Sequence, residues 1–234
     1  MPFQFDNYLV STYSGSFWQL LNPFALLAGV VSSAMITLHG GAYLAHRTEG
    51  LIQDRAVRAA MVAAIVMVVS FIAAGVWLRG MDGYRITSVI NPGALADPWS
   101  KTVLREAGAW MANYGRQPWL WLLPALGVLG ALLAVVLLRV RHTLYAFVCS
   151  ALAVLGVITT AGASMFPFIM PSSTMPSASL TVWDSVSSHL TLSIMLWVTL
   201  IFMPLIVLYT AWAYRVMRGK VTLAYVKENE HGAY

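Results

Sequence analysis

Charge is what this 234-residue sequence has least of, since only 10% of its residues are Asp, Glu, Lys or Arg. Soluble domains carry about 25% charged residues, so this inventory cannot cover a water-exposed surface. The hydrophobic content of 59% and the mean hydropathy of +0.72 point the same way. The scarcity of charge therefore excludes a soluble enzyme and predicts an integral membrane protein.

Cysteine and catalytic motifs are also scarce. The one cysteine, Cys149, lies inside an apolar run, so it cannot form an intrachain disulfide and is expected to be a small core residue. The sequence contains no P-loop, no GxGxxG after a strand, no nucleophile elbow and no CxxC pair. The opening stretch MPFQFDNYLVSTYSGS lacks the basic and apolar regions of a signal peptide, so a transmembrane helix is expected to target the chain.

Long apolar runs are what the sequence does have. A membrane-crossing helix needs about 20 apolar residues, because each residue rises about 1.5 Å across a hydrocarbon core of about 30 Å. Five runs meet this requirement and predict an all-α, polytopic helix bundle. The predicted spans are 24–46, 59–78, 118–138, 143–165 and 186–214. Asn22-Pro23 suits the start of the first span, and Pro124 is a candidate kink in the third.

The Lys and Arg residues predict the orientation of these spans. Nine of them lie in short segments or beside span ends on one side of the predicted bundle, and five lie in a single long loop on the other. The positive-inside rule then places the N-terminus outside and the C-terminus inside. The net charge of +5 is explained by topology and by anionic lipid headgroups, so we expect no nucleic-acid partner.

This orientation divides the chain into three parts. Residues 1–23 form an exterior N-terminal segment, 24–214 the transmembrane bundle and 215–234 a cytoplasmic tail. The exterior loop, 79–117, contains the stretch SKTVLREAGAWMANYG, whose apolar residues at helical spacing predict a short amphipathic helix. Thr181 and Asp184 fit a capping box at the start of the fifth span.

Ionisable residues within membrane spans are the default candidates for function. Only His39 and His189 lie inside the predicted spans, apart from His46 at the inner end of the first span, and Asp184 lies at a span mouth. The two histidines are expected near opposite membrane faces, at levels that differ by roughly 10 Å, so they cannot share one haem iron. A haem with one ligand from this chain and a polar contact between helices both stay open for each histidine.

Two small, polar helix faces and a group of methionines complete the candidates. Ser185, Ser188, His189 and Ser193 form one face, and Ser33, Thr37, Gly40 and Gly41 form the other. Such faces serve as helix contacts or line a route for water or protons. Met165, Met170 and Met175 have no adjacent Cys or His, which favours packing over metal binding. We therefore predict no catalytic, cofactor-binding or metal-binding residue in this chain.

Several stretches nevertheless resemble a known family, the C-terminal half of subunit II of cytochrome bd ubiquinol oxidases. They are FWQLLNPFALLAGVVS, FIAAGVW followed by GMDGY, REAGAW, TAGASMFPFIMPSSTMPSASLTVWDS and LYTAW. The run MFPFIMPSS is specific, because two prolines and a polar end rarely follow a transmembrane helix so directly. The similarity extends over essentially the whole chain.

The resemblance implies a multi-pass subunit of a respiratory quinol oxidase in the bacterial inner membrane, which reduces dioxygen to water and generates a proton gradient. Haem b and haem d are then held by the partner, subunit I. The other implied partners are the N-terminal half of subunit II, membrane lipid, quinol and small accessory subunits. This sequence lacks the GFDxG and HWDGNQVW motifs of the family's first half, so no proton-path residue is carried over. A transporter or channel subunit and a membrane assembly factor are the alternatives.

Overall fold

The computed structural model describes residues 1–91, 97–216, 219–220 and 222. Five of its described helical segments are long and apolar enough to cross a membrane, which confirms the predicted number of spans. They are α2 (Pro23–Arg47), α3 (Gly50–Leu78), the 3-10 turn η3 (Pro118–Trp121) continued by α5 (Leu122–Arg139), α6 (Thr143–Met165) and α7 (His189–Val216).

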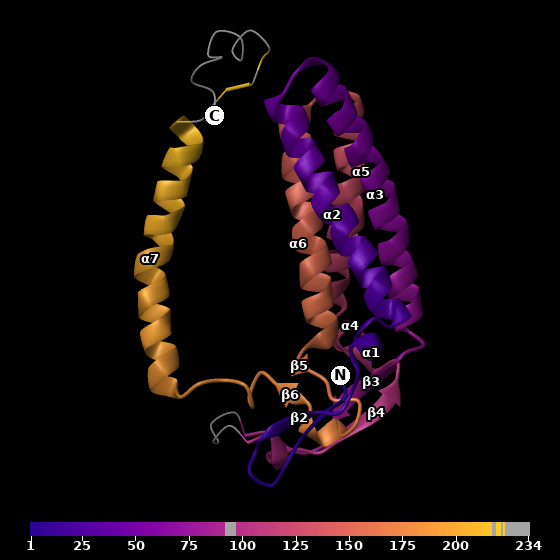
Figure 1. Ribbon diagram of the computed structural model, residues 1–234, viewed down its shortest axis with the longest axis vertical. Helices are drawn as coiled ribbons and strands as arrows, with labels where there is room; N and C mark the ends of the chain where they lie inside the picture. Colours follow the sequence, from indigo (N-terminus) through magenta and orange to yellow (C-terminus); the bar gives the residue numbers. More distant parts are fainter. Residues whose placement is uncertain (92–96, 217–218, 221, 223–234) are drawn as a thin grey trace.

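Four of these helices form a closed bundle, and the fifth stands beside it. α2 packs against α3 and α6, and α5 packs against the same two helices, so the four surround one core of Val, Ala, Leu and Met side chains. In contrast, α7 has no buried residue, and Figure 1 shows it apart from the bundle. The fold is therefore a four-helix bundle with one solitary helix.

The predicted and observed helices agree at some ends and differ at others. Asn22 caps α2 through its side chain, which accepts a hydrogen bond from the Ala25 N–H at 2.9 Å, and Pro23 occupies the first turn as predicted. α3 begins nine residues before the predicted span, because its first two turns are polar but still helical. Pro124 lies in the first turn of α5, where proline disrupts no helical hydrogen bond, so it is not the predicted kink.

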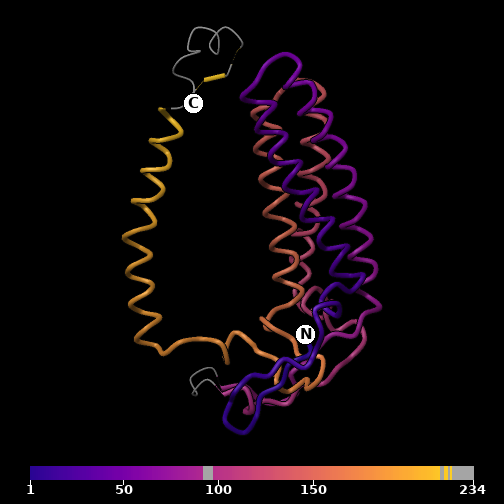
Figure 2. The backbone as a smooth tube through the Cα atoms, in the orientation of Figure 1, coloured from indigo at the N-terminus to yellow at the C-terminus, as the bar shows by residue number. Residues whose placement is uncertain are grey.

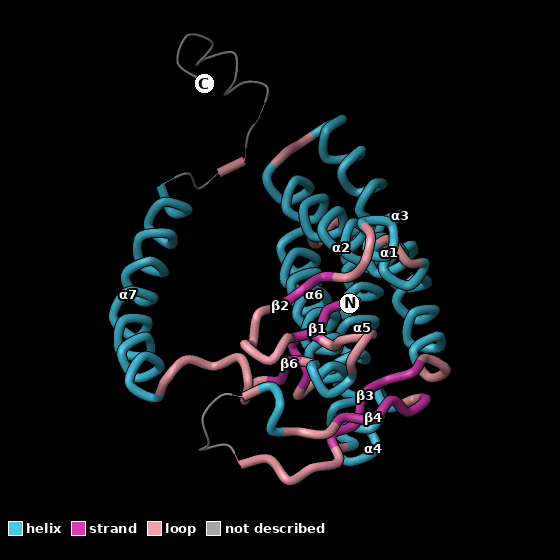
Figure 3. Tube along the Cα trace, turned by 60° about the horizontal axis from the view of Figure 1, so that its bottom comes forward, coloured by secondary structure: helices cyan, strands magenta, loops and turns pink. Residues whose placement is uncertain are grey.

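A layer of loops, short helices and strands covers one end of the bundle, as Figure 3 shows. It contains three antiparallel strand pairs: β1 (Phe3–Phe5) with β2 (Ser11–Tyr13), β3 (Asp82–Ile86) with β4 (Val103–Ala107), and β5 (Phe168–Met170) with β6 (Leu180–Thr181). Its short helices are α1 (Phe17–Leu20), η1 (Pro98–Ser100), η2 (Ala109–Met111), α4 (Ala112–Arg116) and η4 (Pro176–Ala178). We call it the end layer.

The prediction of an amphipathic helix within 79–117 is wrong for the first half of the predicted stretch. Residues Val103–Ala107 form strand β4, and only Ala112–Arg116 is α-helical. Strand pairing is supported by diagonal ion pairs, which Arg105 and Glu106 form with Asp82 and Arg85 of β3. Gly108 then turns the chain with a positive φ of 74°. Val103 is the residue of β4 that is buried.

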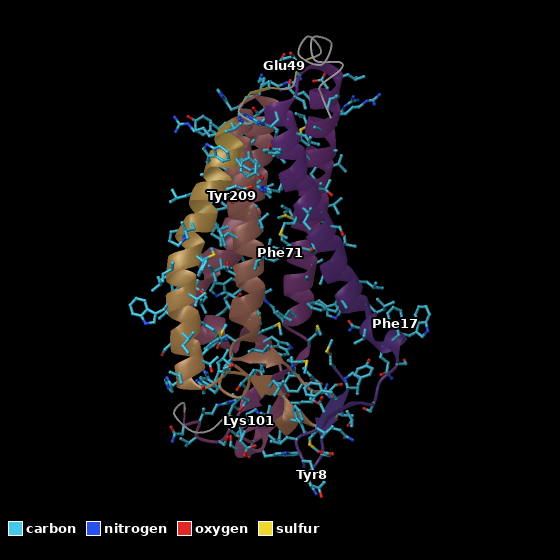
Figure 4. All side chains as sticks on the ribbon, turned by 60° about the vertical axis from the view of Figure 1, so that its left-hand side comes forward. Tyr8, Phe17, Glu49, Phe71, Lys101 and Tyr209 are labelled. Carbon is cyan, nitrogen blue, oxygen red and sulfur yellow. The ribbon has the colours of Figure 1, made fainter. Side chains whose placement is uncertain are left out.

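The N-terminus and the last turn of α7 lie at opposite ends of the molecule. Figure 2 follows the backbone from the N-terminus in the end layer to the upper end of α7. In Figure 4, Tyr8 and Lys101 lie at one end of the molecule and Glu49 at the other. The predicted cytoplasmic tail falls largely outside the described residues, apart from an ion pair of 3.1 Å between Lys220 and Glu49.

Candidate functional site

His39 lies within α2 and is bound to the neighbouring helix α6. Its Nδ1 lies 2.8 Å from the Ser150 hydroxyl, and its ring stacks on Phe147 at a centroid distance of 4.7 Å. The Ser150 hydroxyl donates its proton to the Phe147 carbonyl at 2.7 Å, so His39 must donate from Nδ1. In the neutral ring, Nε2 is then the acceptor. This geometry is that of a polar contact between two helices.

His189 is far from His39. It is the first residue of α7, at the end-layer side, whereas His39 lies sixteen residues beyond Pro23, or roughly 24 Å along α2. Figure 1 shows that α2 and α7 start toward the same end of the molecule and do not adjoin. The two side chains therefore do not converge on one ligand.

The small, polar face predicted for the fifth span does not exist as a helix face. Ser185 and Ser188 precede α7, and both are exposed. In α7 itself, the Ser193 hydroxyl donates to the His189 carbonyl at 2.9 Å, within its own helix. The spacing of three and four residues between these side chains suggested one helix face, but α7 starts later than its apolar pattern suggests.

The predicted face on α2 divides between two roles. Gly41 is buried against α3, where a Cβ atom would lie 2.9 Å from the Ala60 Cβ, so this glycine allows a close helix contact as predicted. Gly40 has open space around it. Ser33 and Thr37 line a groove between α2 and α3, and the Thr37 hydroxyl donates back to the Ser33 carbonyl at 2.8 Å.

A close helix approach, which sequence reasoning missed, joins α5 and α6. A Cβ on Gly156 would lie 2.3 Å from the Gly127 backbone nitrogen, and a Cβ on Gly130 would lie 2.9 Å from the Ala153 nitrogen. Two glycines facing each other allow this crossing, in keeping with the small residues found at membrane helix interfaces. Cys149 packs against the same core, as predicted.

The three methionines lie at the ends of different elements. Met165 ends α6, Met170 ends β5 and Met175 directly precedes η4. Among the described residues, no group of three or more His, Cys, Asp or Glu side chains could hold a metal ion.

The strongest polar cluster is a buried ion pair in the end layer. The Lys101 ammonium lies 2.7 Å from Asp184 Oδ2, and the two side chains are only 2% and 6% exposed. Lys101 also donates to the Pro98 carbonyl at 3.1 Å. Asp184 accepts from the Thr181 N–H at 2.9 Å and from its hydroxyl at 2.6 Å. All three of these contacts of Asp184 are made by the same oxygen, Oδ2.

The capping box predicted for Thr181 and Asp184 is therefore half right. The acid does accept from the Thr181 backbone, but these bonds close a turn before α7, which begins at His189. Lys101 gave no sequence signal, since it is separated from Asp184 by more than eighty residues and no spacing rule connects them. The pair joins the 79–117 loop to the segment that leads into α7.

Four further hydrogen bonds connect the end layer to the bundle and connect its own parts to each other. The Asn113 amide donates to the carbonyls of Ala163 and Phe166 at 2.8 and 2.6 Å, at the end of α6. The Ser173 N–H donates to the Met1 carbonyl at 2.8 Å, and the Ser172 hydroxyl donates to the Phe3 carbonyl. The strands thus form one layer with the loop that carries MFPFIMPSS.

Burial raises the pKa of Tyr84 above its usual value, although the nearby Arg105 guanidinium opposes this change. The guanidinium lies 6.0 Å from the centre of the Tyr84 ring. The ring also adjoins Trp110 and Phe168, with centroid distances of 5.5 and 5.9 Å. Tyr84 is therefore a neutral packing residue of the end layer.

These features define a multi-pass membrane protein with one helix that buries no residue against the described part of the chain. The family model for cytochrome bd terminal oxidase subunit II matches residues 1–217, and the chain belongs to that family. This assignment supports the resemblance noted in the sequence over a transporter, a channel or an assembly factor.

Curated relatives agree with this assignment. Cytochrome bd-I ubiquinol oxidase subunit 2 of Escherichia coli K12 is 49% identical over 235 residues, covering 100% of this chain and 62% of that protein. Probable cytochrome oxidase subunit 2 of Haemophilus influenzae Rd is 44% identical over 234 residues, with the same coverage. The chain thus spans 62% of the length of these relatives.

Proposed function

We propose that this chain acts as subunit II of a quinol:dioxygen oxidoreductase of the cytochrome bd type, in the bacterial inner membrane. In this role it packs against a haem-bearing subunit I and supports it, while the complex reduces dioxygen to water and generates a proton gradient. The family assignment and the names of the relatives support the proposal.

The observation that carries the partner proposal is the solitary helix α7. None of its residues is buried, and large apolar side chains such as Trp197, Phe202 and Leu208 are more than half exposed. Its companions each bury between 22% and 28% of their most apolar stretch within the bundle. A second membrane polypeptide, or the part of subunit II that the relatives have in addition, would give α7 the helix contacts that it lacks here.

Two observations support placing the haems outside this chain. Neither the groove between α2 and α3 nor a second cavity at the α3–α5 end is lined by a histidine. His39 is stacked on Phe147 and donates to Ser150 from Nδ1, so only its Nε2 is left to ligate a metal. We therefore place haem b and haem d on the partner subunit and assign this chain no electron-transfer step.

The orientation inferred from the basic residues belongs to the same proposal. The end layer faces the outside, and the opposite end, where Arg47, Arg58 and Arg139 lie, faces the cytoplasm. Alternate helices run in opposite directions, so the end layer and the upper end of α7 lie on opposite sides (Figure 1). A single cysteine introduced at exposed Tyr8 and labelled in intact cells by a membrane-impermeant maleimide tests this orientation. Protection from the reagent would contradict it.

The oxidase proposal is tested by purifying a tagged form of this chain from membranes with and without the other oxidase genes of its source organism. With them, we expect co-purification of a haem-bearing polypeptide, cytochrome absorbance and quinol-dependent oxygen uptake. Without them, we expect a colourless, inactive chain that is degraded rapidly. Haem bands in the chain purified alone would contradict the division of roles, and absence of any haem protein from the co-expressed sample would contradict the oxidase proposal itself.

A further inference from the structure

Two arginines lie at the boundary between the apolar spans and the end of the bundle opposite the end layer. Arg58 immediately precedes the apolar run of α3, and Arg139 immediately follows that of α5. α3 and α5 pack against each other, so the two guanidinium groups lie at a similar depth, near the level of lipid phosphates. Both side chains are exposed to the surroundings of the chain.

A cavity of about 380 Å³ lies between these two arginines, at the α3–α5 end. Its lining residues are Asp54, Val57, Arg58, Met61, Leu138, Arg139 and Arg141. Asp54 supplies the only carboxylate of this lining, and its Oδ1 is already paired with Arg141 at 2.8 Å. Arg58 donates from Nε to the Asp54 backbone carbonyl at 3.4 Å, which neutralises no charge. The lining therefore holds three cations against one anion.

Arg58 also borders a second, larger hollow, the groove between α2 and α3. This groove has a volume of about 970 Å³ and runs along the two helices toward the end layer. Its lining is mostly small and apolar, as at Gly29, Val30, Val62 and Val66. One arginine thus marks the point where a cationic cavity meets an apolar groove.

We infer that this junction binds an anionic phospholipid. The phosphate is held between Arg58 and Arg139, and one acyl chain follows the α2–α3 groove. Arginine suits this role because its planar guanidinium donates two parallel hydrogen bonds to phosphate oxygens. Basic pockets between membrane helices commonly bind acidic headgroups, and both volumes lie within the usual range for ligand sites, about 300–1,000 Å³.

The structure favours a lipid over a free phosphate ion or an acidic protein segment. A free ion would use the cationic cavity but not the apolar groove that begins at the same residue. An acidic segment of a partner would bring polar backbone into a groove with few polar partners for it. Arginines that merely extend into water would need neither hollow.

The test uses the complete oxidase complex that contains this chain, purified in detergent. Binding of phosphatidylglycerol and of zwitterionic phosphatidylcholine is measured by native mass spectrometry for the unmodified complex, for Arg58→Gln/Arg139→Gln and for Arg58→Lys/Arg139→Lys. Arg55→Gln is the matched control, because Arg55 is an exposed arginine of α3 that lines neither hollow. Excess inorganic phosphate is added as a competitor.

We expect the unmodified complex to prefer phosphatidylglycerol and the double Gln variant to bind it at least about tenfold more weakly. The lysine variant keeps the charge and retains most of the binding, and the Arg55 control is unchanged. Equal binding of the two lipids, displacement by inorganic phosphate or an equal loss in the Arg55 control would each overturn the inference.

A photo-crosslinker identifies the occupant even if the double Gln variant fails to assemble. Benzoylphenylalanine replaces Met61, which lines the cationic cavity. Crosslinking to phosphatidylglycerol after illumination supports the lipid site. Crosslinking to a polypeptide instead shows that a protein segment occupies the cavity, and it overturns the inference.

Discussion

Replacing Asp184 with Asn should loosen the end layer more than any exposed charge substitution. The change leaves the Lys101 ammonium 2% exposed and without its anion, because a neutral amide oxygen replaces Oδ2 and the Pro98 carbonyl is also neutral. Removing one member of a buried pair typically costs about 3–5 kcal/mol, because the other charge stays desolvated. The amide oxygen of Asn still accepts from Thr181, so the loss reports the charge pair and not the turn.

Hydrogen exchange of backbone amides, followed by mass spectrometry, measures this loss where it occurs. We expect faster exchange in peptides that cover residues 97–103 and 180–188, on both sides of the pair, because both segments depend on it. Peptides from α5 should be unchanged, since that helix is held by the bundle core. A free-energy change of about 3 kcal/mol corresponds to roughly a hundredfold faster exchange where exchange follows the opening equilibrium.

Asp82→Asn is the matched control, since it breaks an ion pair of the same layer that is about half exposed on both sides. Exposed ion pairs contribute about 0–1 kcal/mol to stability, so the backbone amides of this variant should exchange at almost the rate of the unmodified protein. A double variant, Lys101→Met with Asp184→Asn, should recover part of the protection because no charge is then buried alone. Equal exchange in Asp184→Asn and Asp82→Asn would refute the reasoning.

Three further substitutions test other contacts. Gly156→Ala should separate α5 from α6, because its Cβ would overlap the Gly127 backbone. We expect a loss of stability of about 1–3 kcal/mol, measured by thermal unfolding in detergent. An unchanged melting temperature would contradict this helix crossing. Tyr114→Phe should cost only about 0.5–1.5 kcal/mol in the same assay, since the phenol donates to the Thr160 carbonyl at 3.1 Å and leaves no buried group without a partner. His189→Gln should leave the haem spectrum of the complete oxidase complex unchanged, and loss of a haem band would contradict the proposal that this chain donates no ligand.

The number of spans could be predicted from the sequence because lipid imposes one simple requirement, a long run without charge. The ends of the helices were harder to predict. The first turns of α3 are polar and extend the helix beyond the apolar run, whereas the predicted start of the fifth span is not helical. The four-plus-one arrangement was not predictable, because helix–helix packing in lipid leaves no hydrophobic contrast between one face and another.

The polar contacts could be predicted only where they are local. The Asn22 cap and the bond between Thr181 and Asp184 follow from a spacing of three residues. The Lys101–Asp184 pair and the His39–Ser150 contact depend on tertiary structure, so no pattern in the chain indicates them. Strand β4 was misread because the apolar spacing of 103–111 suits a helix, and only its partner strand decides otherwise.

The solitary position of α7 also sets an order of events during synthesis. α2, α3, α5 and α6 precede α7 in the chain, so they leave the ribosome before it and can bury one another's small residues at once. α7 follows them, connected to the bundle through the segment after the Lys101–Asp184 pair, and none of its aromatic and branched side chains is buried against the described residues. We therefore expect the membrane's quality-control proteases to recognise an orphan copy by this helix, so that deleting residues 189–216 lengthens the lifetime of the unassembled chain in a pulse-chase experiment.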